Sequence, residues 1–341
     1  MKYRRLGKTD LLVSEIGFGA WGIGGTTAGA TRYGPTNDVV SRKALDCAFE
    51  EGINFFDTSN VYGDGHSEAL IGQAFKKKRS QVLIATKVGL VKYGQATNFS
   101  IKNLSSSFEA SLKRLQTDYV DILQLHNPSL DSIEPIHEIQ AWIDLLKNQG
   151  KVRAFGVSVR SPADGLWVID KLKVQSLQVN FNLLDHRVID SGLVKSSAQN
   201  QVSLIARTPL CFGFLSGKLD TNICFDKLDH RSRWPNQQIN NWAKSSRKML
   251  SYKTNSPYQT NTQFALRFCL SYPQIVTAIP GILNEKEVKE NIIASDLGSL
   301  RTNQIMEIQK AYQKVRFLIE DDSFKKIQSQ DLGKTDSYHK K

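Results

Sequence analysis

The chain has 341 residues and a formal net charge of +12, and 40% of its residues are hydrophobic and 23% charged. This composition is ordinary for a globular protein and argues against long disordered tracts. No run approaches the ~18 consecutive apolar residues of a membrane-spanning helix, and the first residues lack the apolar segment of a signal peptide. Lysine and arginine are scattered along the chain. We therefore expect a soluble cytoplasmic protein with no membrane and no nucleic-acid partner.

The predicted elements begin with a small hairpin over residues 3–14, with its turn at residues 7–10. Short apolar runs rich in β-formers then alternate with longer stretches. The runs are residues 13–19, 53–58, 81–87, 119–126, 152–158, 174–180, 201–208 and 274–281. Helical spacing of apolar residues predicts helices over 101–115 and 136–146, and another over 40–48 with a stop at Gly52.

Apolar strands that each precede a helix predict a parallel sheet covered by helices. Eight such units in about 280 residues match the size of a (β/α)8 TIM barrel, and an open doubly wound sheet is the alternative. Residues 17–22 fit the pattern G-x-G-x-x-G of a dinucleotide fold. The pattern must open a helix, whereas a Gly- and Thr-rich stretch typical of a loop follows it. We therefore expect an α/β fold of the barrel type.

The domain prediction is one barrel over residues 1–319 and a polar C-terminal tail over residues 320–341. The segment 219–256 has no regular apolar pattern and contains Pro235 and many Asn and Gln, so we expect a long irregular connection there. Such a connection in a compact domain is usually functional or mobile. The cysteines are Cys47, Cys211, Cys224 and Cys269. They form no C-x-x-C pair and have no histidine at metal-ligand spacing, so we expect free thiols and no metal site.

Polar residues recur where the predicted strands end, which in a barrel is where active sites lie. They are Asp57, Lys87, His126, Ser158, Gln178, Arg207 and Gly281, with Tyr62 shortly after the second run. A lysine that ends a buried strand needs a partner, because an unpaired buried cation is costly. Asp57 is the candidate partner of Lys87.

At these residues the sequence resembles the aldo-keto reductases. The resemblance spans roughly residues 1–300, and its motifs are residues 6–21, 55–75, 84–89, 121–129, 153–158, 208–219 and 278–294. It implies an NAD(P)-dependent oxidoreductase that interconverts a carbonyl (aldehyde, ketone or sugar) and an alcohol. It also implies a catalytic set of Asp57, Tyr62, Lys87 and His126. Tyr62 would be the general acid, and a phenol pKa near ~10 would be lowered by the Lys87 cation. His126 would orient the substrate carbonyl.

The same resemblance implies how the cofactor is held. Ser158 and Gln178 would bind the nicotinamide carboxamide, and Arg207 would stack on the ring. Val159 stands where relatives often have Asn. The pyrophosphate loop would comprise Leu210, Gly213, Leu215, Gly217 and Lys218. Its glycines would let backbone amides approach the phosphates.

The adenosine end would comprise Gly281, Glu287, Glu290 and Asn291. The family favours NADP, often through a basic residue near the positions of Leu283 or Glu287. Neither residue is basic here, and a carboxylate repels a 2′-phosphate. We therefore expect NADP or NAD, with a leaning to NAD.

The substrate is the least determined part. Trp21, the loop 24–33 and Phe212 would line the mouth, with His126 at the carbonyl, and they suit a small polar carbonyl such as a hydroxy-aldehyde. Two alternatives stay open, a Schiff-base aldolase that uses Lys87 and a cofactor-sensing regulatory subunit. The oligomeric state is undetermined.

Overall fold

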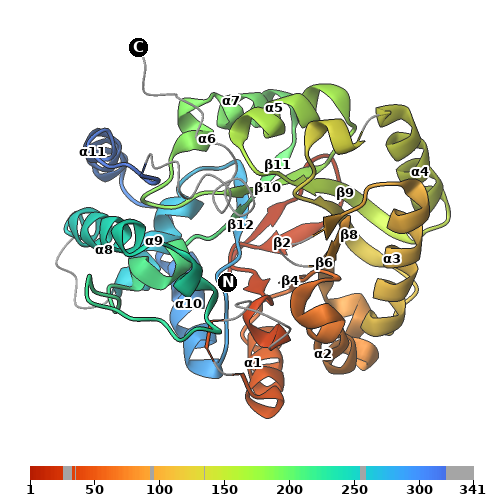
Figure 1. Cartoon of the computed structure of the whole chain (residues 1–341), viewed down its shortest axis with the longest axis horizontal. Coiled ribbons are helices and arrows are strands. Elements are labelled where there is room, and N and C mark those ends of the chain that lie inside the picture. The colour runs from red at the N-terminus through yellow and green to blue at the C-terminus, as the bar shows by residue number, and fades with distance from the viewer. Residues whose placement is uncertain (26–32, 35, 93–95, 134, 254–258, 320–341) are drawn as a thin grey trace.

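Eight parallel strands form the centre of the computed structural model, which describes residues 1–25, 33–34, 36–92, 96–133, 135–253 and 259–319 (Figure 1). In spatial order they are β3 (Phe18–Gly19), β4 (Phe55–Asp57), β5 (Leu83–Val88), β8 (Val120–His126), β9 (Val152–Ser158), β10 (Ser176–Asn180), β11 (Ser203–Arg207) and β12 (Ile275–Ala278). Parallel bridges from Ile16 to Ala278 and from Gly19 to Gly281 join the first strand region to the last. The sheet is therefore a closed barrel, as predicted.

Helices surround the barrel on its outside (Figure 1). They are α1 (Asp38–Glu50), α2 (His66–Phe75), α3 (Ile101–Leu115), α4 (Ile136–Asn148), α5 (Pro162–Lys171), α6 (Arg187–Asp190), α7 (Leu193–Asn200), α8 (Asn236–Leu250), α9 (Asn261–Leu270), α10 (Glu285–Leu297) and α11 (Thr302–Tyr312). Side-chain hydrogen bonds cap the N-termini of several helices. Ser161 and Thr260 form capping boxes with Asp164 and Gln263, which satisfy amides that the first helical turn leaves unpaired.

Two apolar cores follow from the alternation of side chains along each strand. Outward residues pack under the helices in a large cluster. Inward residues such as Phe55, Leu83, Ile122 and Ile205 form a second cluster inside the barrel. Towards the carboxyl ends of the strands the inward positions become polar, as at Asp57, Lys87 and Gln124. The interior is therefore apolar at one end and polar at the other.

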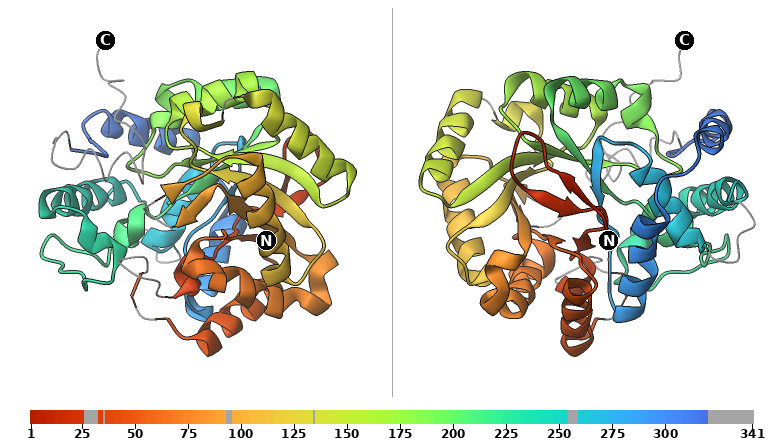
Figure 2. Two further views of the ribbon diagram at one scale, coloured as in Figure 1. Left: turned by 45° about the vertical axis from the view of Figure 1, so that its right-hand side comes forward. Right: turned by 180° about the vertical axis from the view of Figure 1, so that it is seen from behind.

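The N-terminal hairpin covers the apolar end (Figure 2, right). It pairs β1 (Tyr3–Arg5) with β2 (Leu12–Ser14), as predicted. Its Leu6, Leu11 and Val13 are buried and belong to the inner cluster. The apolar run that begins near Val13 therefore divides between the hairpin and β3, so the first barrel strand is shorter than expected. The closed end leaves ligand access to the opposite end.

The prediction for residues 219–256 was wrong in part, because the segment contains the 15-residue helix α8 and the short 3-10 helix η6 (His230–Arg233). Helix α8 packs against the chain just after α11, where Trp242 Nε1 and Gln238 Nε2 both donate to the Phe317 carbonyl. Residues 254–256 of this segment lie outside the described residues, as does the tail 320–341. The domain limits therefore stay a prediction.

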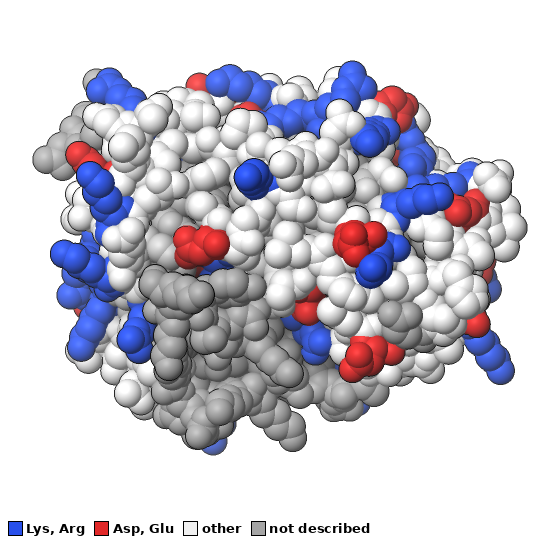
Figure 3. Space-filling view, turned by 90° about the horizontal axis from the view of Figure 1, so that it is seen from above, with Lys and Arg blue, Asp and Glu red and all other residues white. Residues whose placement is uncertain are grey.

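On the face seen in Figure 3, Lys and Arg side chains are dispersed and interspersed with Asp and Glu. The four cysteines are free, as expected. Within the described ranges, no helix combines the length and the apolar character that crossing a bilayer requires.

Candidate active site

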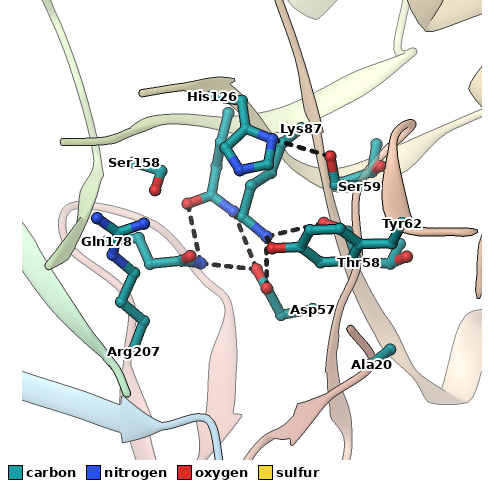
Figure 4. A network of polar contacts seen from close by, with 12 residues as sticks. Ala20, Asp57, Thr58, Ser59, Tyr62, Lys87, His126, Ser158, Gln178 and Arg207 are labelled. Atoms are coloured by element: carbon teal, nitrogen blue, oxygen red, sulfur yellow. Dashed lines mark hydrogen bonds and ion pairs between the residues drawn. The ribbon is translucent and has the colours of Figure 1, made fainter. Parts of the chain in front are cut away.

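A pocket of about 520 Å³ opens at the carboxyl ends of the strands. Its floor is formed by the polar inward residues, whose side chains point toward one another in Figure 4. Residues of the loops that follow the strands line its walls. Asp57, Tyr62 and His126 line it, whereas Lys87 lies fully buried just beneath. The four residues that the resemblance implies as catalytic thus come together in one place.

Lys87 holds the centre of this group. Its Nζ lies 2.5 Å from Asp57 Oδ1, 2.8 Å from the Thr58 carbonyl oxygen and 3.3 Å from the Tyr62 hydroxyl. These contacts engage all three ammonium hydrogens. Burial lowers the pKa of Lys87, and the charge and hydrogen bond of Asp57 oppose that shift. The ion pair therefore fixes the lysine under the phenol.

Asp57 is fixed in turn by two side-chain amides. Its Oδ2 accepts from Gln178 Nε2 at 2.7 Å and from Gln124 Nε2 at 3.1 Å. Asp57, Gln124 and Gln178 come from strands β4, β8 and β10 and are at most 2% exposed. The buried carboxylate thus has partners at both oxygens, which a buried charge requires.

Tyr62 begins the 3-10 turn η2 (Tyr62–Gly65), which lies in the loop between β4 and α2. Gly63 has φ +61°, and its backbone lies so close to Gly24 that a side chain there has no room. This close approach fixes the direction in which Tyr62 leaves the backbone. Burial, and secondly the Asp57 carboxylate, raise the pKa of the Tyr62 phenol above its ordinary value, while Arg207 opposes the shift.

The expected lowering of the Tyr62 pKa by Lys87 is therefore wrong for this structure. Burial is the main cause of the raised pKa, and the Asp57 carboxylate that pairs with the ammonium raises it further. The phenol stays protonated at neutral pH. A protonated phenol is the form that a proton donor needs.

His126 lies beside the phenol at the end of β8. Its ring meets the Tyr62 ring edge to face, with centroids 5.8 Å apart, and its Nδ1 lies 2.9 Å from Ser59 Oγ. Burial first, and then the positive charges of Lys87 and Arg207, hold the pKa of His126 well below its usual range. The imidazole is therefore neutral at physiological pH.

Arg207 and Ser158 meet through a residue that sequence reasoning missed. Asn127, directly after His126, accepts on Oδ1 from Ser158 Oγ at 3.0 Å and from Arg207 Nη1 at 3.2 Å. Arg207 Nη2 also donates to the Val159 carbonyl at 3.1 Å. These bonds hold the guanidinium at the pocket wall, where its plane is available for stacking.

The loop after β11 contains the 3-10 helix η5 (Cys211–Ser216) and two glycines in left-handed conformations, Gly213 at φ +95° and Gly217 at φ +75°. Arg231 fastens η6 onto this loop. It binds the Asp229 carboxylate with two nitrogens and donates to the Phe212 carbonyl at 3.2 Å. The loop therefore turns sharply at its two glycines, and the bonds of Arg231 fasten η6 across it like a strap.

The adenosine end that the resemblance implies lies at the start of α10. Glu287 Oε2 accepts from the Leu283 amide at 2.7 Å, which fixes a carboxylate at the pocket wall. Glu290 and Asn291 also line the pocket. Lys286 and Lys289 are exposed and are not among the lining residues.

Most of the expected cofactor residues line this one pocket. They are Gln178, Arg207, Leu210, Gly213, Lys218, Gly281, Glu287, Glu290 and Asn291. Three expected cofactor residues do not line it: Leu215 packs fully buried in the outer core, Ser158 is fully buried, and Gly217 is exposed. Trp21 and Phe212 line the pocket, and their place at a substrate mouth stays a prediction. Residues 26–32 of the expected mouth loop lie outside the described residues.

Sequence reasoning missed several polar residues of the site, including Gln124, Ser59, Asn127 and His230. Gln124 could have been found, because it lies two residues before His126 and strands alternate their faces. Ser59 and Asn127 sit in loops whose direction no pattern indicates. Within the described ranges, no group of three His, Cys, Asp or Glu side chains is placed to hold a metal ion.

Comparison with known proteins shows which family has this fold and sequence. The family model described as "Aldo/keto reductase family" matches residues 15–313. Aldo-keto reductase YhdN of Bacillus subtilis is 34% identical over 242 residues, which cover 70% of this chain and 71% of that protein. The solved structure of aldo-keto reductase AKR11C1 from Bacillus halodurans, in its holo form, superposes with a TM-score of 0.74 at 27% identity. It covers 94% of this chain and 99% of the other.

The fold and these matches together define an oxidoreductase with an α/β-barrel fold. The chain belongs to the aldo/keto reductase family.

Proposed function

We propose that the protein interconverts a carbonyl and an alcohol with a nicotinamide dinucleotide, and that Tyr62 is the proton donor in reduction. The observation that carries the proposal is the chain of contacts Asp57–Lys87–Tyr62 beneath a pocket that His126 also lines. A reduced nicotinamide supplies a hydride when bound. The oxygen of a carbonyl under reduction gains negative charge and needs a proton, and Tyr62 is the protonated group at this place.

His126 orients the substrate oxygen. The tautomer that accepts from Ser59 through Nδ1 carries its hydrogen on Nε2 and can donate it to a carbonyl oxygen. Because its low pKa keeps the ring neutral, His126 serves as a hydrogen-bond donor without adding a full charge. Lys87 stabilises the phenolate that remains after Tyr62 releases its proton, since its Nζ lies 3.3 Å from that oxygen.

The contacts of Lys87 also weigh against the aldolase alternative. A Schiff-base lysine needs a neutral amine with a free direction of attack. Here Nζ is enclosed by Asp57, Thr58 and Tyr62, and its side chain is fully buried. An ion-pair role fits this enclosure better than nucleophilic attack on a substrate in the pocket.

The residues present fit a dinucleotide. Arg207 offers a planar face at the pocket wall, and Gly213 offers a backbone that phosphates can approach without a side chain in between. Lys218 adds positive charge on the same side. The pocket runs from there to Asn291 on α10, so one ligand can span it.

We propose a preference for NAD(H) over NADP(H). The relatives include a Schizosaccharomyces pombe reductase named for NADP(+) and an NADH-specific methylglyoxal reductase of Escherichia coli, so both occur among them. In this chain the wall at the adenosine end presents the carboxylate of Glu287, pinned by the Leu283 amide. A fixed carboxylate repels a 2′-phosphate and can accept from a free 2′-hydroxyl. Dissociation constants of NADH and NADPH for the wild type and for Glu287→Gln test this, and tighter NADPH binding by the wild type contradicts it.

Absorbance of the reduced cofactor, followed with a panel of aldehydes, ketones and sugars, tests the reaction itself. Replacing Tyr62 by Phe is expected to lower kcat by about 10²–10⁴-fold, because the proton donor is lost while the ring is kept. Cofactor affinity should be retained. Full activity of Tyr62→Phe contradicts the proton-transfer role. Tight cofactor binding with no turnover of any substrate by the wild type favours the regulatory subunit.

A further inference from the structure

Ser59 is a fully buried residue in the loop between β4 and the turn that carries Tyr62. It does not line the pocket, but its hydroxyl points at the ring of His126 (Figure 4). The distance from Ser59 Oγ to His126 Nδ1 is 2.9 Å, an ordinary hydrogen-bond length. One hydrogen bond therefore joins the loop of the proton donor to the imidazole at the end of β8.

The state of the His126 ring decides what the pocket meets at this place. The ring is neutral, because burial and the charges of Lys87 and Arg207 hold its pKa well below the usual range. A neutral imidazole carries one hydrogen, so one nitrogen donates and the other accepts. Nδ1 is engaged by Ser59, whereas Nε2 has no partner in the described part of the chain and is not enclosed. The position of the ring hydrogen therefore makes Nε2 a donor or an acceptor.

Two hydrogen arrangements compete at Ser59. A hydroxyl has one hydrogen to donate, and Ser59 Oγ has two acceptors in reach, His126 Nδ1 at 2.9 Å and Asn60 Oδ1 at 3.2 Å. Protein O–H···O bonds span about 2.5–3.0 Å, so the contact with Asn60 is a long one. The Asn60 amide is held there, because its Nδ2 donates to the Leu90 carbonyl at 2.9 Å. The geometry thus favours His126 as the acceptor.

We infer that Ser59 is a positioning residue that sets the tautomer of His126. Its hydroxyl donates to Nδ1, and the ring hydrogen is thereby kept on Nε2, the nitrogen left for the pocket. The inference rests on the proposed function, in which Nε2 donates to the carbonyl oxygen of the substrate. In the opposite tautomer Nε2 presents a lone pair to that oxygen, and the two groups repel each other. Ser59 therefore acts on the reaction through His126 and without touching the substrate.

NMR of protein labelled with ¹⁵N-histidine tests the tautomer directly, because the protonated and the unprotonated nitrogen of a neutral imidazole have different shifts. The His126 signals are identified by their absence in His126→Asn. We expect a protonated Nε2 and an unprotonated Nδ1 in the wild type at neutral pH. In Ser59→Ala both tautomers become populated, so the two shifts should move toward each other. A protonated Nδ1 in the wild type overturns the inference, as does an unchanged His126 spectrum in Ser59→Ala.

Kinetics test the use of the tautomer. Ser59→Ala is expected to lower kcat/KM for a carbonyl substrate by about 10-fold, the value of one buried hydrogen bond, at an unchanged dissociation constant of NADH. Ser59→Cys keeps the size of the side chain and offers a weak S–H donor, so it should restore part of the loss. Ser197→Ala is the matched control. It removes an equally buried hydroxyl, which bonds the Val194 carbonyl on α7, and should change neither the spectrum nor the rate.

The outcomes separate this inference from the proposed reaction. If the wild type reduces no carbonyl, the proposed function fails, and the shifts of the wild type and of Ser59→Ala still decide whether Ser59 sets the tautomer. A lower rate of Ser59→Ala with unchanged shifts overturns the inference, because Ser59 then supports the loop and not the ring. Altered shifts with an unchanged rate overturn the positioning role. Altered shifts with a lower rate and constant NADH affinity support it.

Discussion

At the scale of single residues, the ion pair between Lys87 and Asp57 is the contact on which the site depends. Both side chains are at most 2% exposed, and the carboxylate has amide donors besides the lysine. A buried pair contributes little net stability, but removing one partner leaves an uncompensated charge in the interior. Stability and activity can therefore be separated by substitution.

Replacing Lys87 by Met is expected to lower the free energy of unfolding by about 3–5 kcal/mol and to abolish turnover. The double variant Asp57→Asn/Lys87→Met removes both charges, so it should regain most of the stability and none of the activity. Urea denaturation and the absorbance assay measure the two properties. Equal stability of the single and double variants would contradict the prediction, because it would show that the Asp57 carboxylate is not destabilising when the lysine is lost.

The same pair shows what the sequence can predict at this scale. That Lys87 ends a strand and needs an anion follows from burial cost alone, and Asp57 was found that way. The pKa of Tyr62 was predicted in the wrong direction, because burial of the phenol and, secondly, the nearby Asp57 carboxylate both raise it. Both effects are set by distances between side chains, and no spacing in the sequence encodes them.

At the scale of elements, α8 shows why the segment after β11 was misread. Its buried positions include the polar Gln238 and Ser246 beside Ile239, Trp242 and Met249. An apolar stripe interrupted in this way is weak evidence for a helix. Gln238 is tolerated because it donates to the Phe317 carbonyl and accepts from the Ile319 amide, whereas Ser246 Oγ finds no partner in the described part of the chain. By contrast, the buried positions of α3 are apolar except for Ser111, and this helix was predicted with its observed ends.

The strap formed by Arg231 gives a prediction at this scale. Arg231→Met removes the bonds to Asp229 and to the Phe212 carbonyl, which fasten η6 over η5. Charge-assisted hydrogen bonds of this kind are worth about a factor of 10 or more, so the dissociation rate of bound NADH should rise by about 10-fold. Stopped-flow fluorescence measures it. Arg247→Met breaks only an exposed pair with Asp220 and should leave the rate unchanged.

At the scale of the whole molecule, the barrel was predictable because eight strand–helix units leave few ways to bury every strand. What the sequence could not indicate is how the ring closes. The first strand spans only Phe18–Gly19, and closure depends on bridges from residues 16 and 19 to residues 278 and 281. The pocket walls, from the turn at Tyr62 to η6, likewise depend on loops brought together only by this closure.

A property of the whole molecule follows from its buried histidines. His126 and His230 have pKa values held well below the usual range, and burial lowers that of His186 to about 3. In the unfolded chain each titrates near ~6.5. Below that pH the unfolded state binds more protons than the folded state, so the free energy of unfolding falls as the pH falls.

We expect the free energy of unfolding to fall by about 4 kcal/mol between pH ~7.5 and ~5.5, since each histidine that stays neutral in the fold contributes about 1.4 kcal/mol over this interval. Urea denaturation at the two pH values measures the difference. His186→Phe, which can keep the stacking on Phe268 and Tyr312, should reduce that difference by about a third. His137 is exposed, so His137→Ala should not change it. A difference that is the same in the wild type and in His186→Phe would contradict the contribution of His186 to the acid sensitivity of the fold.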